Sequence, residues 1–514
     1  METGVGRRIG TLAGVLSAAL AAAATAAGTA AAEEAVNLRI MSYNVWYGGA
    51  QVSLEQTAAA IRAADADIVG LQEPDGNTAR IAAMAGYPYV DLRRHIISRV
   101  PLFDPKLGER TETGQAPYTL AGVDSDAAHV WALVAPGRVV AVANVHLTSD
   151  PYGPNAAQEA AGPDEVLAVE AETRMPEVEA LAAALEPVVA SGAPVFVTGD
   201  FNSPSGRDWT AAVAALRPEV KFPVDWPVPA RMEAAGFTDS FRAVHPDPVA
   251  RPGLTYSPGF PHPVPQEGEI MDRIDYVWSA NATPTASQVV GEAGNPDVDV
   301  AVAPWPSDHR AVVSAFTAVP VEAPALIAVE PRLVEEGGSF LVRVNSPGRA
   351  DWGAVIVPRG GTADAAVTGV DGIMAYWQPG FRFSTHGLSP GAWDAVLLIG
   401  GEEAARTRFS VIPEGGRATI EVVTPEVRPG EPMTVRWSGA PGFRFDWIGV
   451  YAKGDWNLYN YLAFAYTGAV LEGEMTLEPD LYYQVLEPGD YEVRLMADDH
   501  YQVLATAPFT VLPP

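Results

Sequence analysis

Short apolar runs that end at polar or turn-forming residues recur along the first part of the chain. The clearest runs cover residues 38–45, 68–71, 139–146 and 195–199. Runs of this length that are rich in Val and Ile are typical of buried strands, because helices are usually longer. Between them, residues 54–64 and 166–185 carry Ala, Leu and Glu at helical spacing. The pattern predicts a mixed α/β domain with polar residues gathered just after the strand ends.

The pattern changes near residue 320, where strands and turns continue but helical spacing disappears. From there the chain repeats itself: DWGAV at 351–355 returns as DWIGV at 446–450, and FSV at 409–411 returns as FTV at 509–511. Two similar offsets indicate two copies of one domain. Alternating strands over this length predict two all-β sandwiches of immunoglobulin-like kind, at residues 321–414 and 415–514.

The N-terminal 32 residues have the pattern of a signal peptide. Arg7 and Arg8 precede an uncharged, Ala-rich stretch that ends in small residues at 30–32. We therefore predict cleavage after Ala32 and a secreted, periplasmic or cell-surface protein, with a membrane-retained anchor as the alternative. The adjacent Arg pair leaves both the Sec and the twin-arginine export routes open. No uncharged apolar run near 18 residues follows, which predicts a mature chain without a transmembrane helix.

Composition excludes several classes of site. The 514 residues include no Cys, which excludes a disulfide framework, a thiolate zinc site and a cysteine nucleophile. The formal net charge is −30, of which −19 falls on residues 33–320. Such a surface lacks the Lys and Arg that tight, non-specific nucleic-acid binding requires. It is still compatible with a phosphate substrate, because a bound divalent cation supplies positive charge locally.

Eight polar residues stand at or just after the ends of predicted strands. They are Asn44, Glu73, His146, Asp200, Asn202, Asp275, Asp308 and His309. Carboxylates beside buried strands need partners or a metal, because desolvating an unpaired charge costs several kcal/mol. Oxygen ligands suit Mg²⁺, with Mn²⁺ or Ca²⁺ as alternatives, better than zinc. The two histidines can donate to phosphate oxygens or move protons near neutral pH, so this set predicts metal-assisted hydrolysis of a phosphoester.

Taken singly, each of these residues has a structural explanation, such as a turn asparagine or a buried histidine. In their order along the chain they resemble the endonuclease/exonuclease/phosphatase superfamily, also called deoxyribonuclease I-like. The motifs are the Asn-containing first strand, LQE at 71–73, NVHL at 144–147, GDFN at 199–202, RIDY at 273–276 and SDH at 307–309. The resemblance implies a four-layered α/β sandwich with two central sheets, formed by a catalytic domain at residues 33–320.

The resemblance also implies roles for the carboxylates and amides. Glu73 would bind the metal, together with Asn44 and Asp308. Asp200 would orient or deprotonate the attacking water, and Asn202 would hold a phosphate oxygen.

The histidines receive roles from the same resemblance. Asp275 would hydrogen-bond His309, and these two residues share the acid/base role because the family is not uniform about its general base. His146 would donate to the phosphoryl oxygens or protonate the leaving group.

The substrate stays open at this level, because the superfamily hydrolyses DNA, RNA, sphingomyelin, phosphoinositides and other esters. Our first interpretation is an exported nuclease. The alternative is a phospholipase C-like, sphingomyelinase-like or phosphoinositide phosphatase activity on lipids, and a second alternative is a non-catalytic surface-binding protein. The second repeat, with DWIGVY at 446–451 and NYLAF at 460–464, resembles the SKICH module, which implies contact with a surface or a membrane. Arg174 is a further hypothetical phosphate contact, with a helix ion pair as its alternative.

Overall fold

A computed structural model describes residues 34–513, with gaps at 92–93, 104–127, 260–268, 332, 347–350, 372–379, 441–445, 456–457, 459, 469, 479–484 and 497–502. The predicted signal peptide at 1–32 lies outside the described residues.

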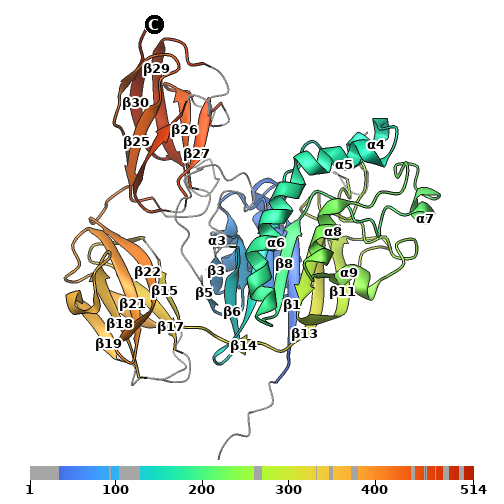
Figure 1. The fold of residues 1–514 in the computed structure, drawn as a ribbon, viewed down its shortest axis with the longest axis horizontal. Coiled ribbons are helices and arrows are strands. Elements are labelled where there is room, and N and C mark those ends of the chain that lie inside the picture. The colour runs from blue at the N-terminus through green and yellow to red at the C-terminus, as the bar shows by residue number, and fades with distance from the viewer. Residues whose placement is uncertain are drawn as a thin grey trace, which may run out of the picture. The chain divides into compact units, whose positions relative to one another are not determined.

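Two sheets form the centre of the first part of the chain (Figure 1). The first has the order β12 (Val300–Val302), β11 (Ala282–Glu292), β13 (Ala311–Ala318), β1 (Val36–Asn44), β2 (Ile68–Gln72), β4 (Ile96–Ser98), β3 (Tyr89–Asp91). The second has the order β5 (Leu102–Phe103), β6 (Val130–Ala135), β7 (Arg138–His146), β8 (Val195–Asp200), β10 (Asp275–Ala280), β9 (Thr238–Asp239). In addition, β14 (Val321–Glu322) pairs with β7.

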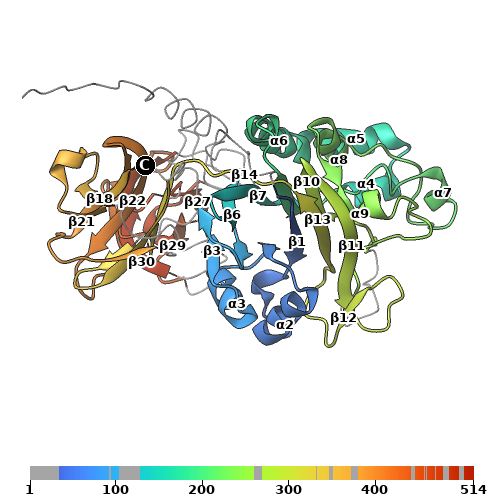
Figure 2. The same cartoon turned by 90° about the horizontal axis from the view of Figure 1, so that it is seen from below.

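Helices cover the outer face of each sheet (Figure 2). On the first sheet lie α2 (Leu54–Ala64) and α3 (Thr78–Ala85), and on the second lie α6 (Arg174–Ala190) and α8 (Pro227–Ala234). Shorter helices are α4 (Gly153–Glu159), α5 (Pro163–Glu172), α7 (Ala211–Ala214), α9 (Ser240–Val244) and the 3-10 turns η1 (Tyr47–Gly49) and η4 (Ala363–Ala365). The inner faces pack on each other through residues such as Ile40, Val142 and Phe196. The predicted four-layered α/β sandwich is confirmed.

The helix predicted at 166–185 is divided in the structure. Thr173 stands between α5 and α6 with non-helical angles (φ −107°, ψ −82°), and its hydroxyl donates to the carbonyl of Val169 at 2.7 Å. A Thr side chain that bonds back to the preceding turn competes with the helical ladder. The apolar spacing continues through this break, so the sequence pattern did not predict it.

A buried polar network joins the two sheets beneath the ends of their strands. Asn144 of β7 accepts hydrogen bonds at its Oδ1 from Gln72 (2.6 Å) and from the hydroxyl of Thr198 (2.8 Å). The network lies directly over Gly70 of β2, where an added Cβ would stand 1.9 Å from the Thr198 hydroxyl oxygen. Only glycine therefore allows the sheets to approach this closely here. The network fixes the spacing of β2, β7 and β8, the strands that carry Glu73, His146 and Asp200.

The second part of the chain repeats one strand order. One three-stranded sheet is β15 (Leu326–Glu330), β17 (Ser339–Asn345), β20 (Phe381–Ser384), beside a five-stranded sheet β16 (Leu333–Glu335), β22 (Glu402–Ile412), β21 (Gly391–Ile399), β18 (Trp352–Pro358), β19 (Thr368–Asp371). The same arrangement returns as β23 (Thr419–Val422), β25 (Met433–Ser438), β28 (Gly473–Leu477) with β24 (Glu426–Val427), β30 (Val503–Val511), β29 (Gly489–Met496), β26 (Trp447–Ala452), β27 (Ala463–Tyr466). The region is all-β, as predicted. Its immunoglobulin-like type stays a prediction.

Each set of sheets has its own buried core, which includes Phe340 and Ile356 in the first set and Val435 and Ile448 in the second. Trp393, Trp437, Trp447 and Tyr451 are all buried, which agrees with a packing role for these aromatic side chains. Among the described residues, no helix has the length and apolarity needed to cross a membrane.

Candidate active site

The sheet topology brings the candidate residues to one edge. Two pairs of neighbouring strands, β1 with β2 and β7 with β8, are parallel. Their carboxyl ends carry Asn44, Glu73, His146 and Asp200. Strand β10 runs antiparallel to β8, so its first residue, Asp275, is paired directly with Asp200. Loops that follow strand ends on a rigid sheet commonly carry the chemistry of a protein.

Asn44 joins the two sheets at this edge. Its Nδ2 donates to Glu73 Oε1 and to Asp200 Oδ2, both at 3.0 Å, while its Oδ1 accepts from the backbone N–H of Trp46 at 3.0 Å. Asn44 is fully buried. In this arrangement its amide nitrogen faces the carboxylates, so Asn44 orients Glu73 and Asp200 directly.

Glu73 is held as an ionised carboxylate. Burial opposes its charge, but His146, the N–H of Tyr47 and Asn44 outweigh burial and lower its pKa. The Tyr47 N–H donates to Glu73 Oε2 at 3.0 Å. A carboxylate that stays charged in a partly buried position is well suited to bind a cation.

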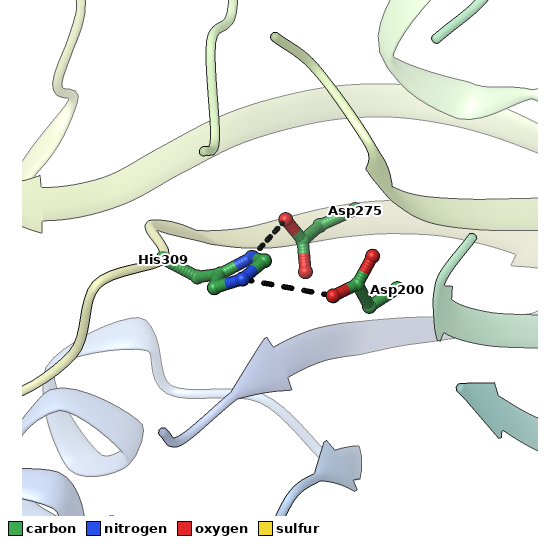
Figure 3. Close-up of side chains that lie close together, drawn as sticks. All are labelled: Asp200, Asp275 and His309. Carbon is green, nitrogen blue, oxygen red and sulfur yellow. Dashed lines mark hydrogen bonds and ion pairs between the residues drawn. The ribbon is translucent and has the colours of Figure 1, made fainter. Parts of the chain in front are cut away.

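His309 lies between two buried aspartates (Figure 3). Its Nδ1 is 2.9 Å from Asp275 Oδ2, and its Nε2 is 3.6 Å from Asp200 Oδ2. Burial disfavours the imidazolium, but Asp275 and Asp200 outweigh burial and raise the pKa of His309 well above its ordinary value. Burial and the neighbouring Asp275 likewise raise the pKa of Asp200. This is the arrangement of a proton-handling pair whose histidine is oriented by a carboxylate.

His146 and Asn202 also contact the carboxylates of the site. His146 Nε2 lies 3.6 Å from Asp200 Oδ2 and 3.9 Å from Glu73 Oε1. Asn202 has a left-handed backbone (φ 48°), and its N–H donates to Asp200 Oδ1 at 2.9 Å. Its Nδ2 donates to the carbonyl of Leu147 at 3.0 Å. Asn202 therefore ties the ends of β7 and β8 together and orients Asp200.

Two sets of residues offer ligands to a metal ion: Asp200 with Asp275 and His309, and Glu73 with Asp308. Asp200, Asp275 and His309 present ligand atoms within 4.8 Å of one another. Asp275 Oδ1 and, outside this group, Asp308 Oδ1 are buried oxygens that have no hydrogen-bond partner among the described residues. Burial and the charges of Glu73 and Asp200 raise the pKa of Asp308 to about 6. Carboxylate oxygens, two of them without a hydrogen-bond partner, fit a hard divalent cation.

A short segment before β10 holds Asp275 and His309 together. The hydroxyl of Thr255 accepts the N–H groups of Ile274 (3.1 Å) and Asp275 (3.2 Å), and its carbonyl accepts the N–H of Arg310 at 2.7 Å. The ring of Tyr256 packs against the His309 ring with 4.8 Å between centroids. Thr255 and Tyr256 were not among the predicted site residues.

Comparison with known proteins agrees with this site. The sequence model described as "Endonuclease/Exonuclease/phosphatase family" matches residues 41–309, a range that includes all eight predicted site residues. The chain belongs to the endonuclease/exonuclease/phosphatase family. Enzymes of this family are hydrolases that act on phosphoesters and usually depend on divalent metal ions.

Several individual proteins are similar to about half of the chain. An uncharacterized protein of Caenorhabditis elegans, F14F9.5, is 29% identical over 258 residues, which cover 47% of this chain and 78% of that protein. A family protein from Bacteroides thetaiotaomicron has 14% identity and a TM-score of 0.34 and covers 55% of this chain and 96% of its own. An AP endonuclease from Archaeoglobus fulgidus has 16% identity and a TM-score of 0.33, with 54% and 98% covered.

Arg174, a hypothetical phosphate contact in the sequence analysis, is a fully buried structural residue. Its guanidinium pairs with the buried Glu170 and donates to the carbonyls of Thr148 (2.8 Å), Ser149 (3.3 Å) and Pro151 (3.0 Å). The hypothesis of a phosphate contact is wrong, because burial and these bonds keep Arg174 from the substrate. Arg174 instead holds the loop that follows His146.

We expect Arg174→Met to lower the free energy of unfolding by about 3 kcal/mol, because removing one partner leaves Glu170 buried and unpaired. Denaturant unfolding would measure it. The matched control is Arg231→Met, which removes a solvent-facing pair with Glu179 on the same helix α6 and should cost no more than about 1 kcal/mol. Equal losses in the two variants would contradict the structural role.

A second buried ion-pair network lies next to the start of β10, and it was not predicted from the sequence. Arg273, in the RIDY motif, donates to Asp208 (2.7 Å) and Asp239 (2.6 Å), and Arg242 donates to Asp208 at 2.5 Å. All four side chains are almost fully buried. The partners of Arg273 lie 65 and 34 residues away in the sequence. The local sequence pattern around Arg273 therefore could not predict this network.

Proposed function

We propose that this chain is an Mg²⁺-dependent phosphodiesterase, and that its substrate is a nucleic acid. The observation that carries the proposal is His309, held between Asp275 and Asp200 at the edge where Asn44 and Glu73 also meet. Family membership supports phosphoester hydrolysis. The substrate and the identity of the ion are our own inferences.

In the proposed mechanism, Asp200 prepares the attacking water. Its Oδ2 accepts from Asn44 and lies 3.6 Å from both His146 and His309. A buried carboxylate with a raised pKa is a stronger base than one in water. Asn202 fixes the other oxygen, Oδ1, through its N–H, so Asp200 keeps one orientation during the reaction.

His309 and His146 handle the charge on the phosphoryl group. Because Asp275 accepts from Nδ1, a charged His309 presents its Nε2 proton toward Asp200 and the reacting group. Charge that develops on the phosphoryl oxygens is then stabilised by donors already in place, and one of the histidines can pass a proton to the leaving oxygen.

The metal belongs with Glu73 and Asp308. In the alternative set, Asp200 with Asp275 and His309, the hydrogen bond to Asp275 uses His309 Nδ1. His309 could bind a cation there only through Nε2, after losing the Nε2 proton that Asp275 and Asp200 favour. A divalent ion at Glu73 and Asp308 would polarise a phosphoryl oxygen as a Lewis acid. Asn44 would join as a ligand only after its amide turned its oxygen toward the carboxylates.

We also propose that residues 1–32 direct export and that the two β-rich repeats attach the enzyme to a surface. Arg7 and Arg8, followed by an uncharged Ala-rich stretch up to residue 32, support export. The repeated strand order supports a pair of related modules, of which the second resembles SKICH domains. The proposed domain limits remain 33–320, 321–414 and 415–514, but β14 (Val321–Glu322), just past the first limit, still pairs with β7 of the catalytic domain.

A substrate panel tests the proposal. The mature protein with Mg²⁺ would be assayed on single-stranded DNA, double-stranded DNA, RNA, sphingomyelin, phosphatidylcholine and a phosphoinositide. We expect cleavage of nucleic acid with a salt dependence weaker than that of a basic nuclease, because the catalytic domain is acidic. Hydrolysis of lipids with nucleic acids untouched would refute the nuclease assignment and leave the phosphoesterase assignment standing.

A further inference from the structure

The turn that follows β1 has an unusual backbone beside the catalytic carboxylates. Four consecutive residues have positive φ: Trp46 (59°), Tyr47 (38°), Gly48 (83°) and Gly49 (67°). Glycine adopts such angles readily, but Trp and Tyr do so only when the surrounding structure imposes them. Backbone strain of this kind concentrates at active sites and ligand-binding loops.

Hydrogen bonds on every side impose this conformation. The N–H groups of Tyr47 and Gly48 donate to Glu73, at 3.0 Å to Oε2 and 2.8 Å to the carbonyl oxygen. Asn77 Nδ2 donates to the carbonyl of Gly48 at 2.9 Å, and the hydroxyl of Thr57 donates to the carbonyl of Gly49 at 2.7 Å. The turn is therefore fixed to the same carboxylate that we assign to the metal.

The side chain of Tyr47 points away from this rigid turn into solvent. Its relative exposure is 67%. Among the described residues, the other exposed large hydrophobic side chains are all Val or Leu. The Glu73 carboxylate, then burial and the charges of Asp308, Asp75 and Asp150, raise the pKa of Tyr47. The ring is thus an exposed flat surface at the rim of the site, within electrostatic reach of its carboxylates.

The charges around this rim disfavour contacts to the phosphates that flank the cleaved bond, but they do not disfavour stacking of a nucleobase. His309 acts electrostatically on Glu73, Asp200 and Asp308, and His146 acts on Glu73 and Asp200. Flanking phosphates would meet carboxylates at the rim. An uncharged nucleobase meets no such repulsion, and stacking on an aromatic ring holds it whatever its sequence.

We propose that Tyr47 is a specificity-determining residue whose ring stacks on an unpaired nucleobase next to the scissile phosphate. The inference rests on the proposed nuclease function and deepens it. A rigid turn attached to Glu73 would place the stacked base at a fixed distance from the reacting phosphate. Because a base must leave its own stack to reach the ring, the enzyme would prefer single-stranded substrates.

The test compares Tyr47→Leu and Tyr47→Phe on two oligomers in Mg²⁺. One is oligothymidylate and the other has the same sugar-phosphate backbone without bases. Tyr47→Leu keeps the backbone N–H to Glu73 and a similar bulk but removes the ring. We expect it to lower kcat/KM on oligothymidylate about 10-fold or more, mainly through KM, and to leave the base-free oligomer unchanged. Tyr47→Phe should behave as wild type.

The controls separate the possible failures. Leu216→Ala removes another exposed large side chain, of relative exposure 65%. It should leave kcat/KM unchanged on both oligomers. If wild type cleaves oligothymidylate and Tyr47→Leu matches it, or loses activity equally on both oligomers, base stacking is refuted while the nuclease assignment stands. If wild type cleaves neither oligomer but hydrolyses another phosphodiester, the nuclease assignment fails and the inference fails with it.

Discussion

Replacing His309 by alanine will lower kcat/KM for a phosphodiester by about 100-fold or more. General acid/base contributions are worth ~10²–10⁴ in rate, and His309 is the group that Asp275 and Asp200 hold in one orientation. Initial rates in Mg²⁺ would measure the loss. Since the imidazole lies against the buried Asp275, unfolding should be followed in parallel to show that the variant is folded.

The matched control for this substitution is His386→Ala, in the exposed part of the first β-rich repeat. It removes the same side chain from a position outside the catalytic sheets and should leave kcat/KM unchanged. A His309→Ala protein that is folded and retains more than about a tenth of the wild-type rate would contradict the role assigned to His309. Equal losses in both variants would contradict it as well.

Removal of divalent cations will abolish activity, and Mg²⁺ or Mn²⁺ will restore it. The physical reason is that Asp308 Oδ1, which has no hydrogen-bond partner among the described residues, and the ionised Glu73 offer oxygen ligands to a hard divalent cation. EDTA supplies the test, and EDTA presaturated with Mg²⁺ is the control for chelator effects. Full activity in free EDTA would refute the metal assignment.

A second readout of the metal does not depend on turnover. A ligand that binds only the folded state raises stability, by about 2.7 kcal/mol at 100 times its Kd. Mg²⁺ should therefore raise the Tm of the wild type. It should not raise the Tm of Glu73→Gln or Asp308→Asn, whose ligand sets are reduced. If Mg²⁺ raises the Tm of both variants as much as that of the wild type, the metal is not bound by Glu73 and Asp308, and Asp200 and Asp275 become the candidate ligands.

Local sequence patterns were sufficient to predict the strands that carry the site. Residues 54–64 form α2 as predicted, and the apolar runs before Asn44, Glu73, His146 and Asp200 are β1, β2, β7 and β8. The reason is that one buried strand is recognisable from its own apolar residues. The motif residues could then be placed, because parallel strands bring their carboxyl ends to one edge.

Residues that act through distant partners were not predictable in this way. Asn144 belongs to a recognised motif, yet its hydrogen bonds to Gln72, Thr198 and the carbonyl of Arg94 depend on how the two sheets face each other. Arg174 resembled a surface helix residue until the structure placed its guanidinium beneath the loop after His146. Neither contact has a local pattern, because the partners lie far away in sequence.

The turn at residues 46–49 shows a different limit. Two consecutive glycines signal a tight turn, but nothing in the sequence shows that Trp46 and Tyr47 share its left-handed backbone. That conformation depends on hydrogen bonds to Glu73, whose own φ of 56° is also positive. Neither this backbone conformation nor the exposed ring that it presents was predicted from the sequence.

The hydrolysis of bis(p-nitrophenyl) phosphate in Mg²⁺ by wild type and by Asp200→Asn tests the central claim most directly. This small soluble phosphodiester needs neither nucleic-acid nor surface recognition, so its rate reports on the site alone. Asn keeps the shape of Asp200 and its position between Asn44 and the histidines, but it cannot accept a proton. We predict hydrolysis by the wild type and a loss of about 100-fold or more in Asp200→Asn. Equal rates in the two proteins, or no hydrolysis by a folded, Mg²⁺-loaded wild type, would contradict it.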